Sequence, residues 1–555
     1  MAKKSSAFSQ AFSQIAEGFS GFKMTKKKLF IILGVVTALV LGFGIYFGLV
    51  PFNLCEGGFR TFLAILLFIW TIPLWVLPQV FGLTKKRKKS LWQIPVYVLC
   101  AFVLVNTVVS IATSPLFMAS KYRGLINVVD NHSFTEDIED YQDMQIPVVD
   151  KGLAEKLGDK KLGEDNLGSQ FSVGEYYMIY HQTNLFWIAP IEFNGFFPWV
   201  NRQVSPGYVL INALDPADVK IVKYPLKYTE SAFFNSDLNR HNYFKNLTAW
   251  RANDAHLELT DEGEPRFVET VYTNVIGYTN GRDIKGIIVT NPDTGKSEYY
   301  DYLNAPKWIN HVLTEEVVIE QLNYWGEYVN GFFNSVFAKS EVLNVSTGVN
   351  YVYSKGDMYL QTGMTSVGSD ESIVGVMMVN MRTKASYFYR IGGATEYSAA
   401  QSAIGKDQEK RYSATDPIMI NIGGIPTYFL MLKDDEGLVK RYAYVNVSDY
   451  RIVSTGDTMQ EALAEYKKQI NVVDKDNAQE RVIKSIEHVL IDGNSYYYIL
   501  FEKVDGDQDG FENIVFKVAL EENAYLPFVK AGDKVKVSYE KGEGVYLISS
   551  IEILG

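Results

Sequence analysis

An acidic loop near the C-terminus carries the residue types that could bind a metal ion. Asp505, Asp507 and Asp509, followed by Gly510, match the first half of an EF-hand loop, whose carboxylate oxygens bind calcium. The twelfth position of such a loop requires a bidentate Glu, and Phe516 stands there. The pattern therefore favours a polar hairpin loop. A weak calcium site is the alternative, and no other cofactor is expected.

Three further chemical templates fail on spacing. Gly295, Lys296 and Ser297 resemble the end of a phosphate-binding loop, but Thr290 stands where the first glycine belongs. The run of residues 363–368 is no nucleophile elbow, because its serine comes one place late. The six histidines form no pair at zinc-ligand spacing: His132, His181, His241, His256, His311 and His488. No catalytic residue is predicted.

A loop rich in Gly, Ser and Thr is the best candidate for a functional surface. It includes Ser366, Asp370 and Glu371, lies between two probable strands, and is followed by Arg382. Polar loops held by a rigid scaffold often carry binding residues. The alternative, which these residue types favour, is an ordinary exposed connection.

The composition limits the class of protein. The chain has 555 residues and a net charge of −11, which disfavours nucleic acid as a partner, because phosphate binding needs clustered Lys and Arg. Its two cysteines, Cys55 and Cys100, fall at different membrane depths, so we expect no disulfide. A eukaryotic secreted domain of this size would usually carry several. These features favour a bacterial cell-envelope protein, or a viral or plasmid-borne protein from such a host.

Three uncharged apolar runs must position everything that follows them. Residues 29–50, 61–83 and 91–114 are each long enough to cross a bilayer as a helix. None contains Asp, Glu, Lys, Arg or His, which argues against an ion-driven transporter and favours an anchor. Gly34, Ala38 and Gly42 recur every four residues, so this face is predicted to pack on another helix. The alternative is that glycine is simply common in membrane helices.

The distribution of basic residues predicts the orientation. Five bases at 85–89 separate the second and third runs, whereas the loop at 51–60 has only Arg60. Positive charge stays in the cytoplasm, so the N-terminus is predicted inside and the bulk of the chain outside the plasma membrane. Residues 1–28 are predicted to form an amphipathic cytoplasmic arm on membrane lipids; the alternatives are a helix that docks on a protein and a disordered tail. The residues expected at the membrane surface are Phe8, Phe12, Ile15, Phe19, Phe22, Lys26, Lys27 and Lys28.

The rest of the chain reads as a β-rich α+β region. We predict a polar stalk at 121–150, two extracytoplasmic α+β domains at 116–338 and 339–475, and a separate barrel at 480–555. Residues 29–115 form the three-helix anchor in this division. A helical stretch from Pro306 carries an apolar stripe that is expected to pack on a sheet: Leu322, Trp325, Val329, Phe332, Phe333 and Val336.

Two segments resemble known folds. In the tail, five strand-like runs around GDKVKVSY resemble an OB-type small barrel, a fold that binds oligonucleotides or oligosaccharides. The acidic balance of the tail makes a structural or protein-binding barrel the better interpretation. The hairpin at 287–302, with its DTG turn and tyrosines, resembles PepSY-type envelope domains. That resemblance implies a regulatory binding module without catalysis.

The sequence therefore predicts a membrane-anchored, non-enzymatic extracytoplasmic scaffold that presents tandem domains to a protein partner or to its own copies. Two alternatives stay open. The chain could be a subunit of a membrane machine for secretion, conjugation or transport, or a hydrolase of envelope polymers that uses an acidic pair without a motif.

Overall fold

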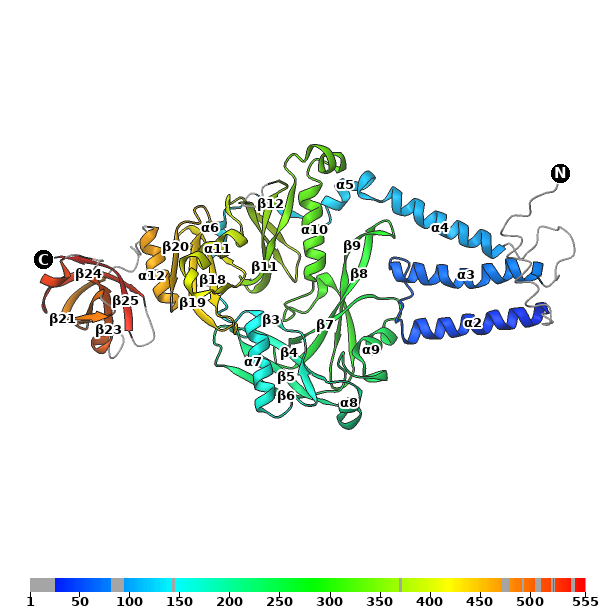
Figure 1. Cartoon of the computed structure of the whole chain (residues 1–555), viewed down its shortest axis with the longest axis horizontal. Coiled ribbons are helices and arrows are strands. Elements are labelled where there is room, and N and C mark those ends of the chain that lie inside the picture. Colours follow the sequence, from blue (N-terminus) through cyan, green and yellow to red (C-terminus); the bar gives the residue numbers. More distant parts are fainter. Residues whose placement is uncertain are drawn as a thin grey trace.

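The computed structural model describes residues 25–80, 94–130, 132–141, 145–368, 372–470, 479–491, 494–504, 511–520, 523, 525–540 and 545–554. The molecule is elongated, with helices α2, α3 and α4 projecting at one end and a small barrel at the other (Figure 1). A β-rich body lies between them. The predicted order of apolar N-terminal helices followed by a β-rich α+β region is confirmed.

The N-terminal helices are α2 (Lys26–Tyr46), α3 (Gly57–Val80) and α4 (Ile94–Ala112). Two of them, α2 and α4, are long and apolar enough to cross a membrane, and α3 contains a shorter apolar stretch, Gly57–Thr71. The side chain of Thr25 caps α2 by accepting a hydrogen bond from Lys28 N at 3.3 Å.

Helices α2 and α3 meet away from the face that the glycine spacing indicated. Gly34, Ala38 and Gly42 are exposed, and a Cβ added at either glycine would meet no atom within 4 Å. At Gly44, by contrast, an added Cβ would lie 2.5 Å from Cε2 of Phe62. The close approach within this chain is therefore at Gly44. Packing of the Gly34–Ala38–Gly42 face on another helix stays a prediction for contacts outside the chain.

The body contains four antiparallel sheets that follow one another along the chain, each built on a four-stranded meander. The first sheet has β2 (Phe171–Val173), β3 (Tyr177–His181), β4 (Asn184–Phe193), β5 (Ser205–Asn212) and β6 (Val219–Leu226). The second has β7 (Trp250–Leu259), β8 (Pro265–Ile276), β9 (Asn280–Thr290) and β10 (Ser297–Asp301).

The third sheet comprises β11 (Leu343–Ser354), β12 (Asp357–Ser366), β13 (Ser372–Asn380), β14 (Ser386–Tyr389) and β15 (Gly393–Ala394), with β1 (Val128–Val129) added in parallel at β14. The fourth comprises β16 (Ser413–Ala414), β17 (Ile418–Ile422), β18 (Ile425–Lys433), β19 (Val439–Asn446) and β20 (Val453–Gly456).

Helices connect and cover these sheets, and polar caps fix where several of them begin. Asp150, Thr395 and Thr458 accept backbone N–H bonds at the starts of the seventh, eleventh and twelfth helices. The helices of the body are α5 (Pro115–Arg123), α6 (Phe134–Asp137), α7 (Lys151–Glu164), α8 (Phe196–Arg202), α9 (Leu238–Lys245), α10 (Glu315–Glu327), α11 (Glu396–Lys406) and α12 (Met459–Gln469).

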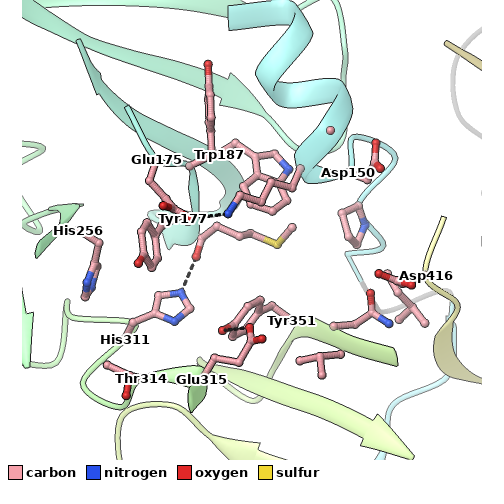
Figure 2. Close-up of a pocket in the computed structure, with 18 of the residues that line it drawn as sticks. Asp150, Glu175, Tyr177, Trp187, His256, His311, Thr314, Glu315, Tyr351 and Asp416 are labelled. Carbon is pink, nitrogen blue, oxygen red and sulfur yellow. Dashed lines mark hydrogen bonds and ion pairs between the residues drawn. The ribbon is translucent and has the colours of Figure 1, made fainter. Parts of the chain in front are cut away.

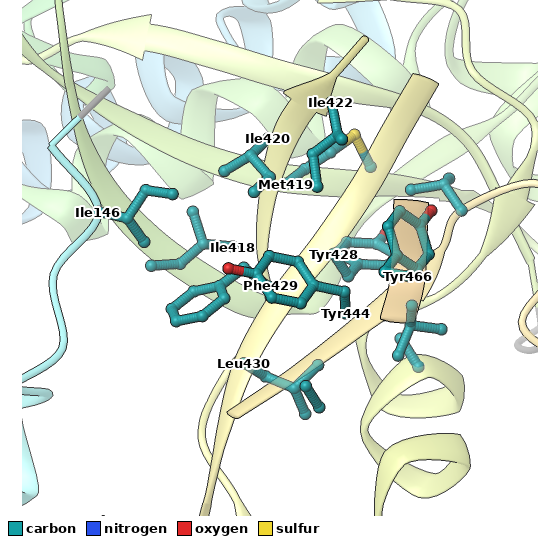
Figure 3. Close-up of a cluster of buried hydrophobic side chains, with 14 of the residues drawn as sticks. Ile146, Ile418, Met419, Ile420, Ile422, Tyr428, Phe429, Leu430, Tyr444 and Tyr466 are labelled. Atoms are coloured by element: carbon teal, nitrogen blue, oxygen red, sulfur yellow. The ribbon is translucent and has the colours of Figure 1, made fainter. Parts of the chain in front are cut away.

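The third sheet is the common wall of two hydrophobic cores. On one side Met377 and Val379 pack with Val268 of the second sheet and Val317 of α10. On the other side Val376 and neighbouring residues join the fourth sheet in a core that includes Tyr428, Phe429 and Tyr444 (Figure 3). The first of these cores crosses the boundary predicted near residue 338. The division into two domains stays a prediction, and packing joins its two halves.

The predicted polar stalk is wrong. Phe134, Ile138 and Ile146 are buried in the core beside the fourth sheet, and Val149 is fully buried below the first sheet. The apolar residues of this segment are interspersed with acidic ones, so the sequence alone resembles a polar stalk. Burial of those apolar side chains holds the segment against the body.

The body therefore sits directly on the ends of the helices. Asn274 Nδ2 donates to Cys55 O at 2.7 Å, and Arg60 Nη1 donates to Tyr278 O at 3.2 Å. Asn280 Nδ2 donates to Ser110 O of α4 at 3.0 Å. Helix α9 makes similar contacts with the end of α2 and the loop after it, through Arg240 and Tyr243.

The five strands predicted in the tail are confirmed. They are β21 (Gln479–Ile491), β22 (Asn494–Phe501), β23 (Val515–Ala519), β24 (Lys534–Glu540) and β25 (Val545–Ile553), and they form a closed barrel in the order β21-β22-β23-β25-β24. Alternation drives the closure: Val535 and Val537 are buried, whereas Lys536 between them is exposed. The barrel has a core of its own.

Candidate functional site

A cavity of about 930 Å³ lies where the four sheets meet. Its wall comes from the start of α7, from β3 and β4, from β7 and β8, from β11, from the loop into α10, and from the fourth sheet (Figure 2). Ligand sites are typically concave, largely apolar and furnished with a few polar groups. This cavity has that character. Its labelled residues in Figure 2 are Asp150, Glu175, Tyr177, Trp187, His256, His311, Thr314, Glu315, Tyr351 and Asp416.

Two tyrosines face the cavity with their hydroxyl groups bound to carboxylates. Tyr177 donates to Asp254 Oδ2 at 2.9 Å, and Tyr351 donates to Glu315 Oε2 at 3.0 Å. Burial raises the pKa of both tyrosines, and the carboxylate beside each raises it further. Both phenols therefore stay neutral hydrogen-bond donors across the physiological pH range.

A β-bulge brings Asp254 to the cavity. The pairing of β7 with β8 shifts register between Arg251 and Ala255, and Asn253 adopts a left-handed backbone conformation with φ of 57°. A bulge re-aims the side chains next to it. Here it leaves Asp254 exposed at the cavity, although its neighbours Arg251 and Ala255 are buried.

A buried carboxylate fixes the floor of the cavity. Glu258 accepts hydrogen bonds from the backbone N of His311 at 2.8 Å and of Asn310 at 2.7 Å, and it bonds Nε2 of His256 at 3.1 Å. Burial raises the pKa of Glu258, but its hydrogen bonds, above all the one with His256, outweigh this effect, so the pKa is lowered. The ring of His256 stacks on Tyr177 with 4.7 Å between centroids.

Burial lowers the pKa of His311 more than Glu258 raises it. The Nε2 atom of His311 lies 2.7 Å from Met178 O. Loop residues 310–314 lead from this network directly into α10, whose first residue is Glu315. The network thus sets the position of the α10 N-terminus at the cavity.

The remaining charges on the wall are partly neutralised. Lys151 pairs with Glu175 at 2.6 Å, and Asp150 is paired with Lys433, also at 2.6 Å. Burial and the charge of Asp150 raise the pKa of Asp416, and Lys433 offsets part of this effect. The cavity is consequently more acidic than basic.

The two described residues of the predicted functional surface, Ser366 and Arg382, lie far apart, and the surface itself stays a prediction. Ser366 ends β12, whereas Arg382 binds Asp357 at the start of the same strand, with 2.8 Å from Nε to Oδ1. A ten-residue strand separates them by roughly 30 Å. Asp370 and Glu371 lie outside the described residues.

Several other predicted sites also lie outside the described residues. They are the candidate calcium ligands Asp505, Asp507 and Asp509 and the membrane-surface residues Phe8, Phe12, Ile15, Phe19 and Phe22. Lys27 and Lys28 are exposed in the first turn of α2, which also includes Lys26. In the part of the chain that the structure describes, no group of three or more His, Cys, Asp or Glu residues is arranged to hold a metal ion.

The Gly295-Lys296-Ser297 turn is committed to internal packing. Gly295 has φ of 70°, its carbonyl lies 2.7 Å from Nε2 of His241, and its N–H donates to Asn291 O. A Cβ at Gly295 would lie 2.7 Å from the ring of Tyr228. This turn joins β9 to β10 as a tight hairpin connection.

Sequence reasoning missed the cavity, although one signal was present. His256 and Glu258 are two residues apart on β7, so they lie on one face of a strand and can interact. Nothing local connects them with His311, which follows 53 residues after Glu258. The aromatic and acidic members come from still more distant elements.

Comparison with known proteins gives no family for the chain. No family model matches it, and no curated protein matches it. Among solved structures, a mutant GH32 beta-fructofuranosidase of Bombyx mori in complex with sucrose aligns at 10% identity over 67% of this chain and 68% of that chain, with a TM-score of 0.18. A levansucrase mutant of B. megaterium aligns at 9% identity over 69% and 85%, with a TM-score of 0.17. Scores this low carry no argument about fold or function. The sequence resemblances stay limited to the tail and one hairpin.

Proposed function

We propose that this chain is a membrane-anchored binding protein of the bacterial cell envelope, with its N-terminus in the cytoplasm and its β-rich body outside. The observation that carries the proposal is the cavity between the four sheets, which combines aromatic walls with hydroxyl and carboxylate groups. Binding, rather than catalysis, fits its tyrosines best, because burial keeps them protonated and hydrogen-bonded.

The junction of helices and body supports the membrane part of the proposal. The C-terminal ends of α2 and α4 and the start of α3 contact the body through Arg240, Asn280 and Arg60. Three antiparallel spans would put these ends on one side of a bilayer, together with the body. The basic segment at 85–89 would then lie on the opposite, cytoplasmic side.

The tail barrel supports an interaction role of its own. Its strand order, with β23 parallel to β25 and β21 paired with β24, fits an OB-type barrel. Such barrels bind extended ligands across one face. We propose a protein-binding use here, since the chain is acidic overall.

Labelling of single cysteines tests the orientation. In a chain in which Cys55 is replaced by Ser and Cys100 by Ala, Lys296→Cys and Lys88→Cys each introduce one thiol. The Lys296 side chain is 76% exposed on the body. A membrane-impermeant maleimide should label Lys296→Cys in intact cells, and Lys88→Cys only after permeabilisation. The reverse pattern would refute the orientation.

Photo-crosslinking from the cavity tests binding. We expect p-benzoylphenylalanine at position 351 to yield a discrete adduct in intact cells, because Tyr351 faces the cavity. The matched control places the same residue at exposed Tyr299, outside the cavity wall. Equal adducts at both positions, or none at 351, would contradict a ligand in the cavity.

A further inference from the structure

We propose that the cavity binds an alkylammonium group, either in a free polyamine or on a lysine side chain of an envelope peptide. This inference rests on the proposed binding function and names its ligand class. It starts from an imbalance: six carboxylates line the cavity, against one lysine, Lys151, and two histidines, His256 and His311. The carboxylates are Asp150, Glu175, Asp254, Glu315, Glu316 and Asp416.

Half of these carboxylates already have cations. Glu175 pairs with Lys151, Asp150 with Lys433, and Glu316 with Arg282 at 2.9 Å. Among the described residues, no Lys, Arg or His nitrogen lies within 4.0 Å of the carboxylates of Asp254, Glu315 or Asp416. These three carboxyl groups are therefore available to a cationic group that enters the cavity.

The surroundings of these carboxylates select an organic cation over a bare metal ion. Asp254 and Glu315 each accept a tyrosine hydroxyl, and the rings of Tyr177 and Tyr351 form the wall beside them. An ammonium group gains from carboxylates and from aromatic faces together. The methylene chain of an alkylamine would lie against Trp187, Ile319 and Val349, which also line the cavity.

The size of the cavity fits a ligand longer than one amine. Its volume of about 930 Å³ is in the range of drug-sized ligands. Asp254 lies on β7 of the second sheet, and Asp416 lies in the loop between β16 and β17 of the fourth sheet. Figure 2 labels Asp416 on one side of the cavity and His256, which is also on β7, on the other. Separated carboxylates suit a ligand that carries a positive charge at each end.

Calorimetric titration of the full chain in detergent tests the inference. The probes are 1,5-diaminopentane and an acetylated, amidated Gly-Lys-Gly peptide, with the Nε-acetylated peptide and heptanedioate as controls. We expect at least one amine probe to bind and neither control to bind. Which amine binds tells a free polyamine from a peptide side chain. Binding of neither amine overturns the inference, and so does equal binding of heptanedioate.

Paired substitutions locate the binding site. Asp254→Asn with Glu315→Gln should weaken amine binding at least tenfold, with the melting temperature monitored to show that the fold persists. The matched control, Glu262→Gln with Asp293→Asn, removes two exposed carboxylates outside the cavity wall and should leave affinity unchanged. An equal loss of amine affinity in both double variants would refute the placement of the binding site in the cavity. An in-cell crosslink at position 351 without amine binding would refute the ligand class and leave the binding function standing.

Discussion

Replacement of Glu258 by Ala should strongly destabilise the body. Glu258 has no exposed surface, and its two oxygens accept bonds from His256, from Asn310 and from the backbone of His311. Removal of the carboxylate leaves several buried donors without an acceptor, at about 1–3 kcal/mol each. A total loss of roughly 4–6 kcal/mol is a large share of the 5–15 kcal/mol typical of folded proteins.

Calorimetry of the full chain in detergent measures this effect. Glu258→Ala should lower the main melting temperature by about 10 °C or abolish the transition. Glu258→Gln keeps one acceptor oxygen and should cost less. Glu262 lies in the exposed turn between β7, the strand that carries Glu258, and β8. The free energy of unfolding of Glu262→Ala should stay within about 0.5 kcal/mol of that of the natural chain. A Glu258→Ala variant as stable as the Glu262 control would show that the network contributes nothing.

Replacement of Arg251 by Met should have the second large effect. The Arg251 and Glu269 side chains are only 2% and 0% exposed, and Arg251 Nη1 lies 3.0 Å from Glu269 Oε1. Asn242 Nδ2 donates to the same carboxylate at 2.9 Å. Loss of the cation leaves a buried negative charge, which typically costs 3–5 kcal/mol. We expect a loss of this size in the free energy of unfolding, measured by urea denaturation at pH 8.

The pH dependence and a double substitution distinguish this mechanism. Burial already raises the pKa of Glu269, with Arg251 offsetting part of the effect, so without Arg251 the folded pKa rises further. An acid whose folded pKa exceeds its unfolded pKa destabilises the fold as pH rises above the unfolded value. The deficit of Arg251→Met should therefore shrink towards pH 5. Arg251→Met with Glu269→Leu should recover at least half of the stability. A pH-independent deficit, or a double variant less stable than the single one, would contradict this account.

The sequence predicted those features that local pattern determines. The barrel strands were placed correctly because alternating residues such as Val535, Lys536 and Val537 signal a strand by themselves. In this case the signal lies within a few residues of the element.

Features that depend on tertiary packing were not predicted from the sequence. The stripe that includes Leu322 and Trp325 is buried as predicted, but α10 ends at Glu327, and Phe333 beyond it is 64% exposed. The periodicity continues into a π-helix, Asn334–Ala338, that faces away from the core. The cavity was not predicted either, because four sheets supply its wall and no single segment of the sequence contains enough of its residues to indicate it.

The hydrogen bonds between the helix ends and the second sheet have a mechanical consequence. Asn280, bound to Ser110 of α4, begins β9, and the paired strand β8 carries Tyr272 on the wall of the cavity. Tyr272 in turn shares a 2.9 Å hydrogen bond with Thr314, which precedes α10. The hydrogen-bonded pair of β8 and β9 is too stiff to absorb a displacement of α4 between Asn280 and Tyr272. A sliding or tilting of α4 would thus be transmitted to the cavity as a change of shape, and by reciprocity an occupant of the cavity would bias the position of α4 relative to the body.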